Sequence, residues 1–349
     1  MTGTVLVARL DSAGDVLLAG PAIRAVAARA RVELLCGPNG AEAGSLLPGV
    51  HQTEVWAAPW IVEPAPAATP RHVDRLIELV CGLDPDEAIV LTSFHQSPLP
   101  LALLLRLAGV PRITGASVDY AGTLLDVRLR PGEDFAEEQS EVTRALGIAA
   151  AAGYVLPADD DGRLAVAPPP DTAALTGSRP YVVVHPGAAV PARTWPAGHH
   201  RAAVQRLRDA GLGVVVTGSA RERELTAWVA GEAGLDLGGR TDLRQLSGVL
   251  AGAAAVVVGN TGAAHLAAAV GSPVVSLFSP VVSERCWRPF GVPVVVLGRT
   301  DTACAGSRAR VCPVPGHPCL ADVTPATVVE AVLGVARTPS AAQVEVIAT

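Results

Sequence analysis

Short runs of β-branched residues alternate along this chain with longer stretches of helical period that are rich in Ala, Leu and Arg. In the first half, strand-like runs cover residues 4–9, 32–36 and 88–92, and helical stretches cover 16–30 and 98–107. Strands that alternate with helices pair as parallel sheets covered by helices. The alternation therefore predicts an α/β fold of doubly wound sheets.

A Pro- and Ala-rich stretch interrupts this alternation at residues 167–180. The second half then repeats the pattern over 181–185, 200–209, 213–218, 221–233, 254–259, 263–269 and 273–278. A chain of 349 residues has room for two ordinary domains. We therefore expect Rossmann-like domains at 1–166 and 181–337, a linker at 167–180 and a tail at 338–349. Ligands bind beyond the carboxyl ends of such strands, so the domains should face each other across a cleft.

Composition excludes several classes of protein. Half of the residues are hydrophobic and 17% are charged, which rules out global disorder. The net charge of -6 gives no general attraction for a nucleic-acid backbone. All 27 basic residues are arginine, so Schiff-base chemistry and a P-loop lysine are impossible.

The first residues do not resemble a secretory signal. Arg9, Asp11 and Asp15 stand where a signal peptide needs an uninterrupted apolar core. The most apolar helical run, at 99–110, is too short to span a bilayer and contains Arg106. We expect a soluble cytoplasmic protein with at most peripheral membrane contact.

The first predicted strand-to-helix turn, RLDSAGDV, lacks the G-x-G-x-x-G spacing that binds a dinucleotide. It does place Gly14 and Asp15 at the start of a helix. Asp15 either faces a ligand in the predicted cleft or caps the helix, which contributes about 1 kcal/mol.

Three loops of the second half suggest a nucleotide site. In HPGAAVPARTWP, Arg193 can bind a phosphate or form a surface ion pair. TGSARERE has small residues for close backbone approach, with Glu222 as a ribose acceptor or part of a helix cap. In VVVGNTGAAHLAAAVG, Thr261 and Gly262 start a helix whose free N–H groups favour an anion. His265, one turn later, is either structural or a ligand contact.

These motifs together resemble glycosyltransferase family 9, which contains the ADP-heptose heptosyltransferases. The resemblance runs from about residue 5 to about residue 333 and includes LTSFHQSPLPLALLLRLAGVPRITGASVDYAG in the middle of the chain. It implies a GT-B fold, with the acceptor on the N-terminal domain and the nucleotide sugar on the C-terminal one. It also implies inversion at the anomeric carbon.

The resemblance assigns roles to individual residues. Asp15 matches the catalytic base, Arg193 the residue that meets the phosphates, and residues 239–243 the segment that holds the base. Asn260 stands where the family commonly has Asp, so a negative charge is missing there. The residues expected to bind the donor are Arg193, Trp195, Thr217, Gly218, Ser219, Glu222, Thr241, Leu243, Asn260, Thr261, Gly262 and His265. Those expected to bind the acceptor are Ser12, Gly14, His95 and Gln96.

We expect neither a metal nor a cofactor to be needed. A metal-dependent mechanism would need paired carboxylates, and those at 84–86 and 159–161 suit caps and solvated turns. Near the end of the chain, the possible zinc ligands are Cys304, Cys312, His317 and Cys319. They lack a C-x-x-C spacing, so reduced cysteines in a packed loop are the preferred interpretation.

The predicted function is inverting, metal-independent transfer of a sugar, heptose in this family, from an ADP-linked donor to an acceptor hydroxyl. The acceptor can be a glycan, a lipopolysaccharide-like molecule or a secondary metabolite. Few basic residues flank the N-terminal motifs, which argues against a multiply phosphorylated lipid. The alternative is a non-catalytic nucleotide-sugar-binding protein on the same fold, and the missing glycine motif counts against a dehydrogenase.

Overall fold

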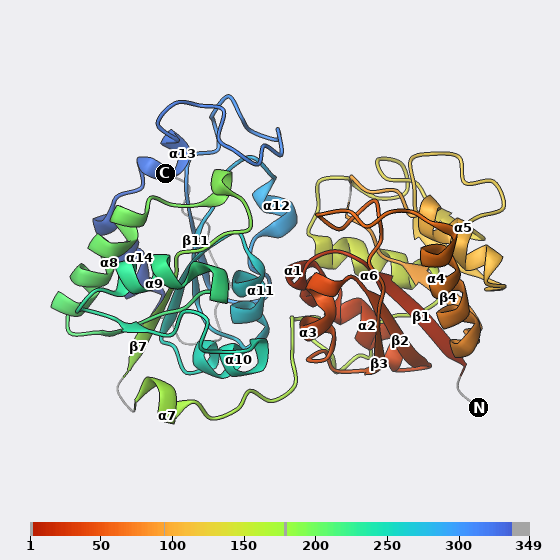
Figure 1. Cartoon of the computed structure of the whole chain (residues 1–349), viewed down its shortest axis with the longest axis horizontal. Helices are drawn as coiled ribbons and strands as arrows, with labels where there is room; N and C mark the ends of the chain where they lie inside the picture. Colours follow the sequence, from red (N-terminus) through yellow and green to blue (C-terminus); the bar gives the residue numbers. More distant parts are fainter. Residues whose placement is uncertain (1–2, 94, 178–179, 337–349) are drawn as a thin grey trace. The chain divides into compact units, whose positions relative to one another are not determined.

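The computed structural model describes residues 3–93, 95–177 and 180–336. It divides into two compact units, Met1–Ala167 and Pro168–Thr349. Within the described ranges, each unit contains a six-stranded sheet in which neighbouring strands are parallel. Figure 1 shows helices packed around the strands of each unit. The predicted α/β, doubly wound fold is confirmed.

The strands of the first unit are β1 (Thr4–Arg9), β2 (Arg31–Cys36), β3 (Val50–Val55), β4 (Glu87–Val90), β5 (Ile113–Ala116) and β6 (Val127–Leu129). They lie in the order β3-β2-β1-β4-β5-β6. The central strands β1 and β4 are almost wholly buried, which explains their apolar composition. β1 and β4 start the two halves of the sheet, and ligand sites form where two such halves meet.

The helices of the first unit are α1 (Ala13–Leu18), α2 (Gly20–Ala27), the 3₁₀ turn η1 (Pro38–Gly40), α3 (Ala41–Gly44), α4 (Pro70–Leu83), α5 (Leu99–Leu107) and α6 (Glu141–Ala151). The single helix predicted at 16–30 is wrong, because α1 and α2 are separate. Pro21 has no N–H to donate to the carbonyl of Leu17, so it stands in the first turn of a new helix.

The strands of the second unit are β7 (Tyr181–His185), β8 (Gly213–Val216), β9 (Leu235–Asp236), β10 (Ala255–Gly259), β11 (Val274–Leu277) and β12 (Val294–Leu297). Their order, β12-β11-β10-β7-β8-β9, repeats the topology of the first unit. The helices and 3₁₀ turns are α7 (Ala173–Thr176), η2 (Pro191–Arg193), α8 (Ala197–Asp209), η3 (Ala220–Glu222), α9 (Arg223–Ala230), α10 (Leu243–Ala251), α11 (Gly262–Ala269), α12 (Glu284–Trp287), α13 (Pro318–Ala321) and α14 (Pro325–Val335).

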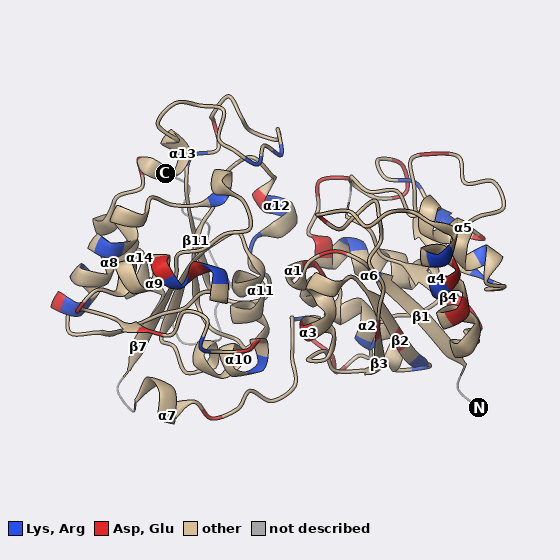
Figure 2. Ribbon diagram, viewed as in Figure 1, with Lys and Arg blue, Asp and Glu red and all other residues tan. Residues whose placement is uncertain are grey.

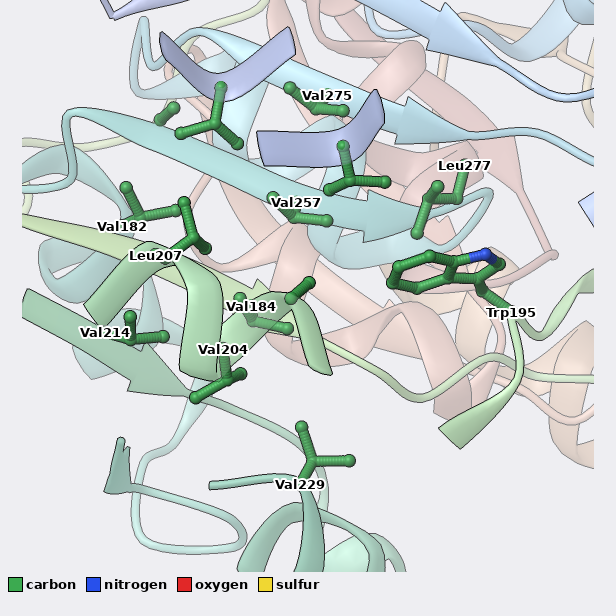
Figure 3. Close-up of a cluster of buried hydrophobic side chains, with 14 of the residues drawn as sticks. Val182, Val184, Trp195, Val204, Leu207, Val214, Val229, Val257, Val275 and Leu277 are labelled. Carbon is green, nitrogen blue, oxygen red and sulfur yellow. The ribbon is translucent and has the colours of Figure 1, made fainter. Parts of the chain in front are cut away.

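One face of the second sheet is covered by α8, α9 and α14. Figure 3 shows valines of neighbouring strands, such as Val184 and Val257, in one buried cluster with Leu207 of α8 and Val229 of α9. Valine suits this position because its branched side chain packs well on a pleated surface that is buried on both faces. The core therefore fixes the strands whose carboxyl ends carry the nucleotide motifs.

Pro170 and Thr172 of the predicted linker pack against Gly248 of α10 in the second unit. A Cβ on Gly248 would lie 2.3 Å from the carbonyl oxygen of Pro170, so a glycine is needed there. Residues 178–179 and the predicted tail at 338–349 lie outside the described residues. No helix in the described ranges has both the length and the apolar composition needed to cross a membrane. Figure 2 shows acidic and basic residues interspersed within each unit.

Candidate functional site

Arg9 ends the central strand of the first unit, and its side chain is 2% exposed. A guanidinium buried this deeply needs partners, because an uncompensated buried charge costs about 3–5 kcal/mol. Its Nε lies 2.9 Å from Asp11 Oδ2. Its Nη2 lies 3.1 Å from Asp15 Oδ1 and 3.2 Å from Glu141 Oε2, and it donates to Ser93 Oγ at 2.7 Å. We call these five residues the Arg9 cluster.

The sheet topology brings three segments together in the Arg9 cluster. β1 and β4 are parallel neighbours, so their carboxyl ends meet at one edge. Asp11 and Asp15 follow β1, and Ser93 follows β4. Glu141 begins α6, where the hydroxyl of Ser140 caps the helix by accepting a backbone N–H at 3.1 Å. The cluster therefore lies at the edge where doubly wound sheets bind ligands.

Arg144, one turn further along α6, supports the same edge. Its Nε donates to the carbonyl oxygen of Thr92 at 3.1 Å, and its guanidinium lies 4.9 Å from the centroid of the Phe135 ring. The residue is 2% exposed. Arg144 thus ties α6 to the loop after β4 and places a second positive charge near Glu141.

Asp15 makes the helix-capping contact that the sequence offers as one of its two alternatives. Its Oδ2 accepts from the hydroxyl of Ser12 at 2.7 Å and from the N–H of Ser12 at 3.4 Å, forming a capping box at the start of α1. Its Oδ1 pairs with Arg9. The side chain of Asp15 is 20% exposed, against 9% for Asp11 and 1% for Glu141. Asp15 is therefore the carboxylate of the cluster that a ligand reaches most easily.

Burial and charge act against each other in the Arg9 cluster. Burial raises the pKa of Asp11 to about 6, although Arg9 lowers it. Burial also raises the pKa of Glu141, against the lowering effect of Arg9 and Arg144. For Arg9, burial alone would lower the pKa, but the three carboxylates raise it above its ordinary value. The guanidinium therefore keeps its charge, while the two buried carboxyls hold protons more strongly than they would in water.

We expect the free energy of unfolding to depend on pH through Asp11. Its pKa is raised from 3.8 to about 6 in the folded chain, so the folded state binds more protons than the unfolded state between these values. The stability contributed by this group is fully present below about pH 4 and is lost as the pH rises through about 6. The free energy of unfolding, measured with urea at several pH values across this range, should depend less steeply on pH in Asp11→Asn than in the wild-type protein. Equal slopes in the two proteins would contradict the raised pKa.

Two of the four residues predicted to bind the acceptor meet the Arg9 cluster. Ser12 bonds to Asp15, and Gln96 donates its amide to Asp11 while it accepts from the N–H of Ser93 at 3.3 Å. Gly14 is buried within α1, and His95 is exposed. Phe94, which the sequence places in the same motif, lies outside the described residues.

Sequence reasoning misses Arg9, Asp11 and Glu141 as site residues. It treats Arg9 and Asp11 only as charges that interrupt an apolar leader. One signal could have found Arg9, because a charge that closes a buried β-branched run requires a partner. Its partner Glu141 is 132 residues away, and no local pattern joins the two.

In the second unit, the loops after β7 and β8 meet around Glu222. Its Oε2 accepts from the N–H and from the hydroxyl of Ser219, both at 2.7 Å. A Cβ on Gly187 would lie 1.8 Å from Glu222 Oε1, so this close approach requires glycine. Glu222, which is predicted to contact the ribose, thus lies at the carboxyl end of the sheet and also closes a capping box.

The segment at 239–243, which is predicted to hold the base, lies beside the loop after β8. Gly239 has φ +61° and donates its N–H to the carbonyl oxygen of Gly218 at 2.8 Å. The carbonyl oxygen of Gly239 accepts from Arg223 Nη2 at 2.9 Å. Thr241 and Leu243 follow in the same segment and are half-buried. The structure therefore brings this segment next to the glycine-containing turn after β8.

β10 ends in the turn that starts α11. Thr261 is the N-cap residue, and its hydroxyl oxygen is buried with no hydrogen-bond partner among the described residues. Gly262 is the first residue of α11, where backbone N–H groups lack partners within the helix and favour an anion. Asn260 is 5% exposed. A Cβ on Gly259 would lie 3.1 Å from the backbone oxygen of Arg193, so the Arg193 loop meets the same turn.

Trp195 and Thr217, which the sequence predicts to bind the donor, have buried side chains. Trp195 is 1% exposed, packs in the core and donates its Nε1–H to the carbonyl oxygen of Val323 at 3.0 Å (Figure 3). Thr217 is fully buried, with its hydroxyl 3.0 Å from His185 Nδ1. Both side chains support the loops from inside. His265 is 3% exposed, which fits the structural alternative.

The segment that contains Cys304 and His317 packs against the loop that contains Arg193. Cys304 packs with Ala192 and Val281, and His317 Nε2 lies 3.2 Å from the carbonyl oxygen of Ala192. All six cysteines are free thiols. In the part of the chain that the structure describes, no three His, Cys, Asp or Glu side chains are placed to hold a metal.

The carboxylate pairs that a metal-dependent mechanism would need make structural contacts. Asp84 ends α4 in the left-handed conformation, and Asp86 accepts from the N–H of Thr4 at 2.7 Å. Asp160 binds Arg24 through two hydrogen bonds of 2.6 and 2.8 Å.

Comparison with known proteins supports the resemblance. The family model of glycosyltransferase family 9 (heptosyltransferase) matches residues 76–317. The chain is 33% identical to lipooligosaccharide heptosyltransferase 2 of Haemophilus influenzae over 115 residues, which cover 31% of this chain and 33% of that protein. It is 29% identical to lipopolysaccharide heptosyltransferase 2 of Escherichia coli over 221 residues, or 56% and 60% of the two chains. The matches thus span from a third to three fifths of these curated relatives.

A solved structure shares the fold over nearly the whole chain. The structure of E. coli ADP-heptose lps heptosyltransferase II superposes with a TM-score of 0.73 at 23% identity, covering 95% of this chain and 98% of that one. The two Rossmann-like units therefore have the GT-B fold. Since the family model covers most of the chain, this protein belongs to glycosyltransferase family 9.

Proposed function

We propose that this chain is an inverting, metal-independent glycosyltransferase that moves heptose from ADP-heptose to a hydroxyl group of an acceptor. The Arg9 cluster carries the proposal, because it holds the partly exposed carboxylate of Asp15 at the carboxyl edge of the first sheet. The curated relatives are heptosyltransferases, which supports heptose as the sugar. The E. coli protein of similar fold is an ADP-heptose heptosyltransferase, which supports ADP as the carrier.

Asp15 acts in this proposal as the general base. Its carboxylate takes the proton of the acceptor hydroxyl while the hydroxyl oxygen bonds to the anomeric carbon. The bond from that carbon to the phosphate oxygen breaks with its electron pair, and ADP leaves. Attack from the face opposite ADP inverts the anomeric configuration. Arg9 and Ser12 hold the carboxylate in place during this step.

The second unit binds the donor. Arg193 and the start of α11, at Thr261 and Gly262, stabilise the charge that develops on the leaving diphosphate. Asn260 can donate a hydrogen bond there but supplies no negative charge. Glu222 accepts from the ribose, and the 239–243 segment holds the adenine. No cofactor takes part, and the partners are the nucleotide sugar and a hydroxylated acceptor.

The direct test is to incubate the protein with ADP-heptose and a panel of hydroxylated acceptors. We expect ADP release in step with a heptosylated product, whose anomeric configuration NMR should show to be inverted. Product with retained configuration would contradict the mechanism. Binding of ADP-heptose without turnover on any acceptor would instead support the non-catalytic nucleotide-sugar-binding alternative.

We expect Arg193→Ala to weaken ADP binding roughly 10- to 100-fold, because a hydrogen bond to a charged group contributes about 1.5–3 kcal/mol. Calorimetric titration in the presence of EDTA measures this loss. The matched control is Arg206→Ala on the exposed face of α8, which should bind ADP normally. Equal affinities in both variants would remove Arg193 from the site. ADP binding that required added magnesium would contradict metal independence.

A further inference from the structure

One nitrogen atom of Arg9 faces more acceptors than it has hydrogens. A guanidinium carries five N–H bonds, and two of them belong to Nη2. In the Arg9 cluster, Nη2 lies 2.7 Å from Ser93 Oγ, 3.1 Å from Asp15 Oδ1 and 3.2 Å from Glu141 Oε2. Two hydrogens cannot form three separate and well-directed bonds, so the three oxygen atoms compete for one donor group.

The distances show how Nη2 is shared. Ser93 Oγ is the nearest acceptor, and the two carboxylate oxygens lie at the long end of the usual range for N–H···O bonds. Bonds from a cationic N–H to a carboxylate are commonly shorter, at about 2.7–2.9 Å. Asp15 and Glu141 therefore each receive a weaker bond from Nη2 than one carboxylate would receive alone.

Glu141 is too deeply buried to act on a substrate itself. Its side chain is 1% exposed, whereas that of Asp15 is 20% exposed. Its Oε1 has no hydrogen-bond partner among the described residues, so its bond to Arg9 is made through Oε2. Burial raises the pKa of Glu141, but Arg9 and Arg144 both favour its charged form. Because a buried charge needs compensation, Glu141 keeps a hold on the guanidinium of Arg9.

The carboxylates of Asp15 and Glu141 also repel each other. The negative charge of Asp15 raises the pKa of Glu141. This interaction energy belongs to the pair, so Glu141 likewise disfavours the charged form of Asp15. Asp11 adds a third carboxylate, but it pairs with Arg9 through Nε and accepts from the amide of Gln96. Competition for Nη2 and repulsion thus act on Asp15 in the same direction.

A carboxylate that shares its cation is a stronger base than one that holds the cation alone. A full ion pair stabilises the charged form of the carboxylate and weakens its tendency to take a proton. General-base catalysis requires a group that can accept the proton as the bond to the anomeric carbon forms. Arg9 therefore has to orient Asp15 without neutralising it.

We propose that Glu141 and Ser93 are positioning residues for the transfer step, because they occupy Arg9 Nη2 and so keep Asp15 oriented but basic. This inference rests on the proposed function, in which Asp15 takes the proton of the acceptor. Ser93 is 2% exposed, so both residues act through Arg9 and not by contact with a substrate. The proposal gives α6 and the loop after β4 a part in catalysis.

The titration of the Asp15 carboxyl group tests the competition without any substrate. In protein labelled with ¹³C at the aspartate carboxyl carbons, the signal that disappears in Asp15→Asn belongs to Asp15, and its chemical shift is followed against pH. We expect this signal to titrate roughly one pH unit lower in Glu141→Gln than in wild type, because the amide keeps the size of the side chain and removes its charge. Ser93→Ala should cause a smaller change in the same direction, because it frees one hydrogen of Nη2.

The matched control is Glu87→Gln. It makes the same substitution at a buried glutamate that begins β4 and pairs with Arg112, away from the carboxyl edge of the sheet. This variant should leave the titration of Asp15 unchanged even if its Tm falls. If Glu141→Gln does not fold, Ser93→Ala decides the test.

Heptose transfer gives a second measurement that separates positioning from a structural role. We expect kcat to fall roughly 3- to 10-fold in Glu141→Gln, with KM unchanged for ADP-heptose and for the acceptor, because only the strength of the base changes. A rise in KM with kcat unchanged would overturn the proposal.

The titration has its own contrary outcomes. An Asp15 signal that titrates at the wild-type pH or higher in Ser93→Ala and in folded Glu141→Gln would overturn the proposal, as would an equal change in Glu87→Gln. The expected change in titration without transfer by the wild-type protein would count against the proposed function, and the competition for Arg9 would stand.

Discussion

Replacing Asp15 with Asn should lower kcat for heptose transfer about 10²–10⁴-fold and leave the affinity for ADP unchanged. The amide keeps the size of the carboxylate, and its oxygen can still accept from Ser12, but it cannot take the proton of the acceptor. The residues proposed to hold ADP all belong to the second unit, so binding should not depend on this change. Initial rates of ADP release and calorimetric titration with ADP measure the two quantities.

Ser12→Ala is the control for the capping role of Asp15. It removes the hydroxyl that bonds to Asp15 and leaves the carboxylate in place. Loss of such a cap costs about 1 kcal/mol, so Tm should fall while turnover stays far above that of Asp15→Asn. Near wild-type turnover in Asp15→Asn would contradict its role as a base. A lower Tm with no specific loss of turnover would leave Asp15 as a capping residue.

Arg9→Met should have the largest effect on stability, a loss of about 3–5 kcal/mol in the free energy of unfolding. The substitution fills a similar volume but leaves the buried carboxyls of Asp11 and Glu141 without their cation. A surface substitution such as Arg206→Met should cost less than about 0.5 kcal/mol. Urea unfolding at neutral pH measures both variants.

The loss of unfolding free energy caused by Arg9→Met should become smaller as the pH falls. The buried carboxyls already have raised pKa values, and protonation removes the charges that lack a partner. Arg9→Lys should retain part of the stability, because it keeps the charge but lacks the planar guanidinium, which donates to Asp15 and Glu141 and pairs with Asp11. A loss of under about 1 kcal/mol in Arg9→Met would show that the cluster does not depend on this charge.

The fold could be predicted where the strands are buried on both faces. β1, β7 and β10 are continuous apolar runs, as the centre of a parallel sheet requires. The edge strand β3 reads VHQTEV and is largely solvent-accessible, so no apolar run distinguishes it from a loop. β9 has only two residues, which is too short for any periodicity to appear.

The site could be predicted where one loop carries the whole motif. Asn260, Thr261 and Gly262 are adjacent and start a helix, so their common location follows from the sequence. In the Arg9 cluster, Ser93 is 84 positions from Arg9 in the sequence and Glu141 is 132 positions from it, so only the fold brings them together. The sequence gives no sign that Trp195 is buried, because it lies close to Arg193 in a polar loop. Its side chain nevertheless packs in the core.

Equilibrium binding of nucleotide sugars tests most directly whether this family 9 protein uses an ADP-linked heptose. Calorimetric titration of the wild-type protein with ADP-heptose, UDP-glucose and GDP-mannose compares donors that share the diphosphate and differ in base and sugar. We predict that ADP-heptose binds at least about tenfold more tightly than the other two, a difference of about 1.4 kcal/mol. Tighter binding of UDP-glucose or GDP-mannose, or no binding of ADP-heptose, would contradict the proposed donor.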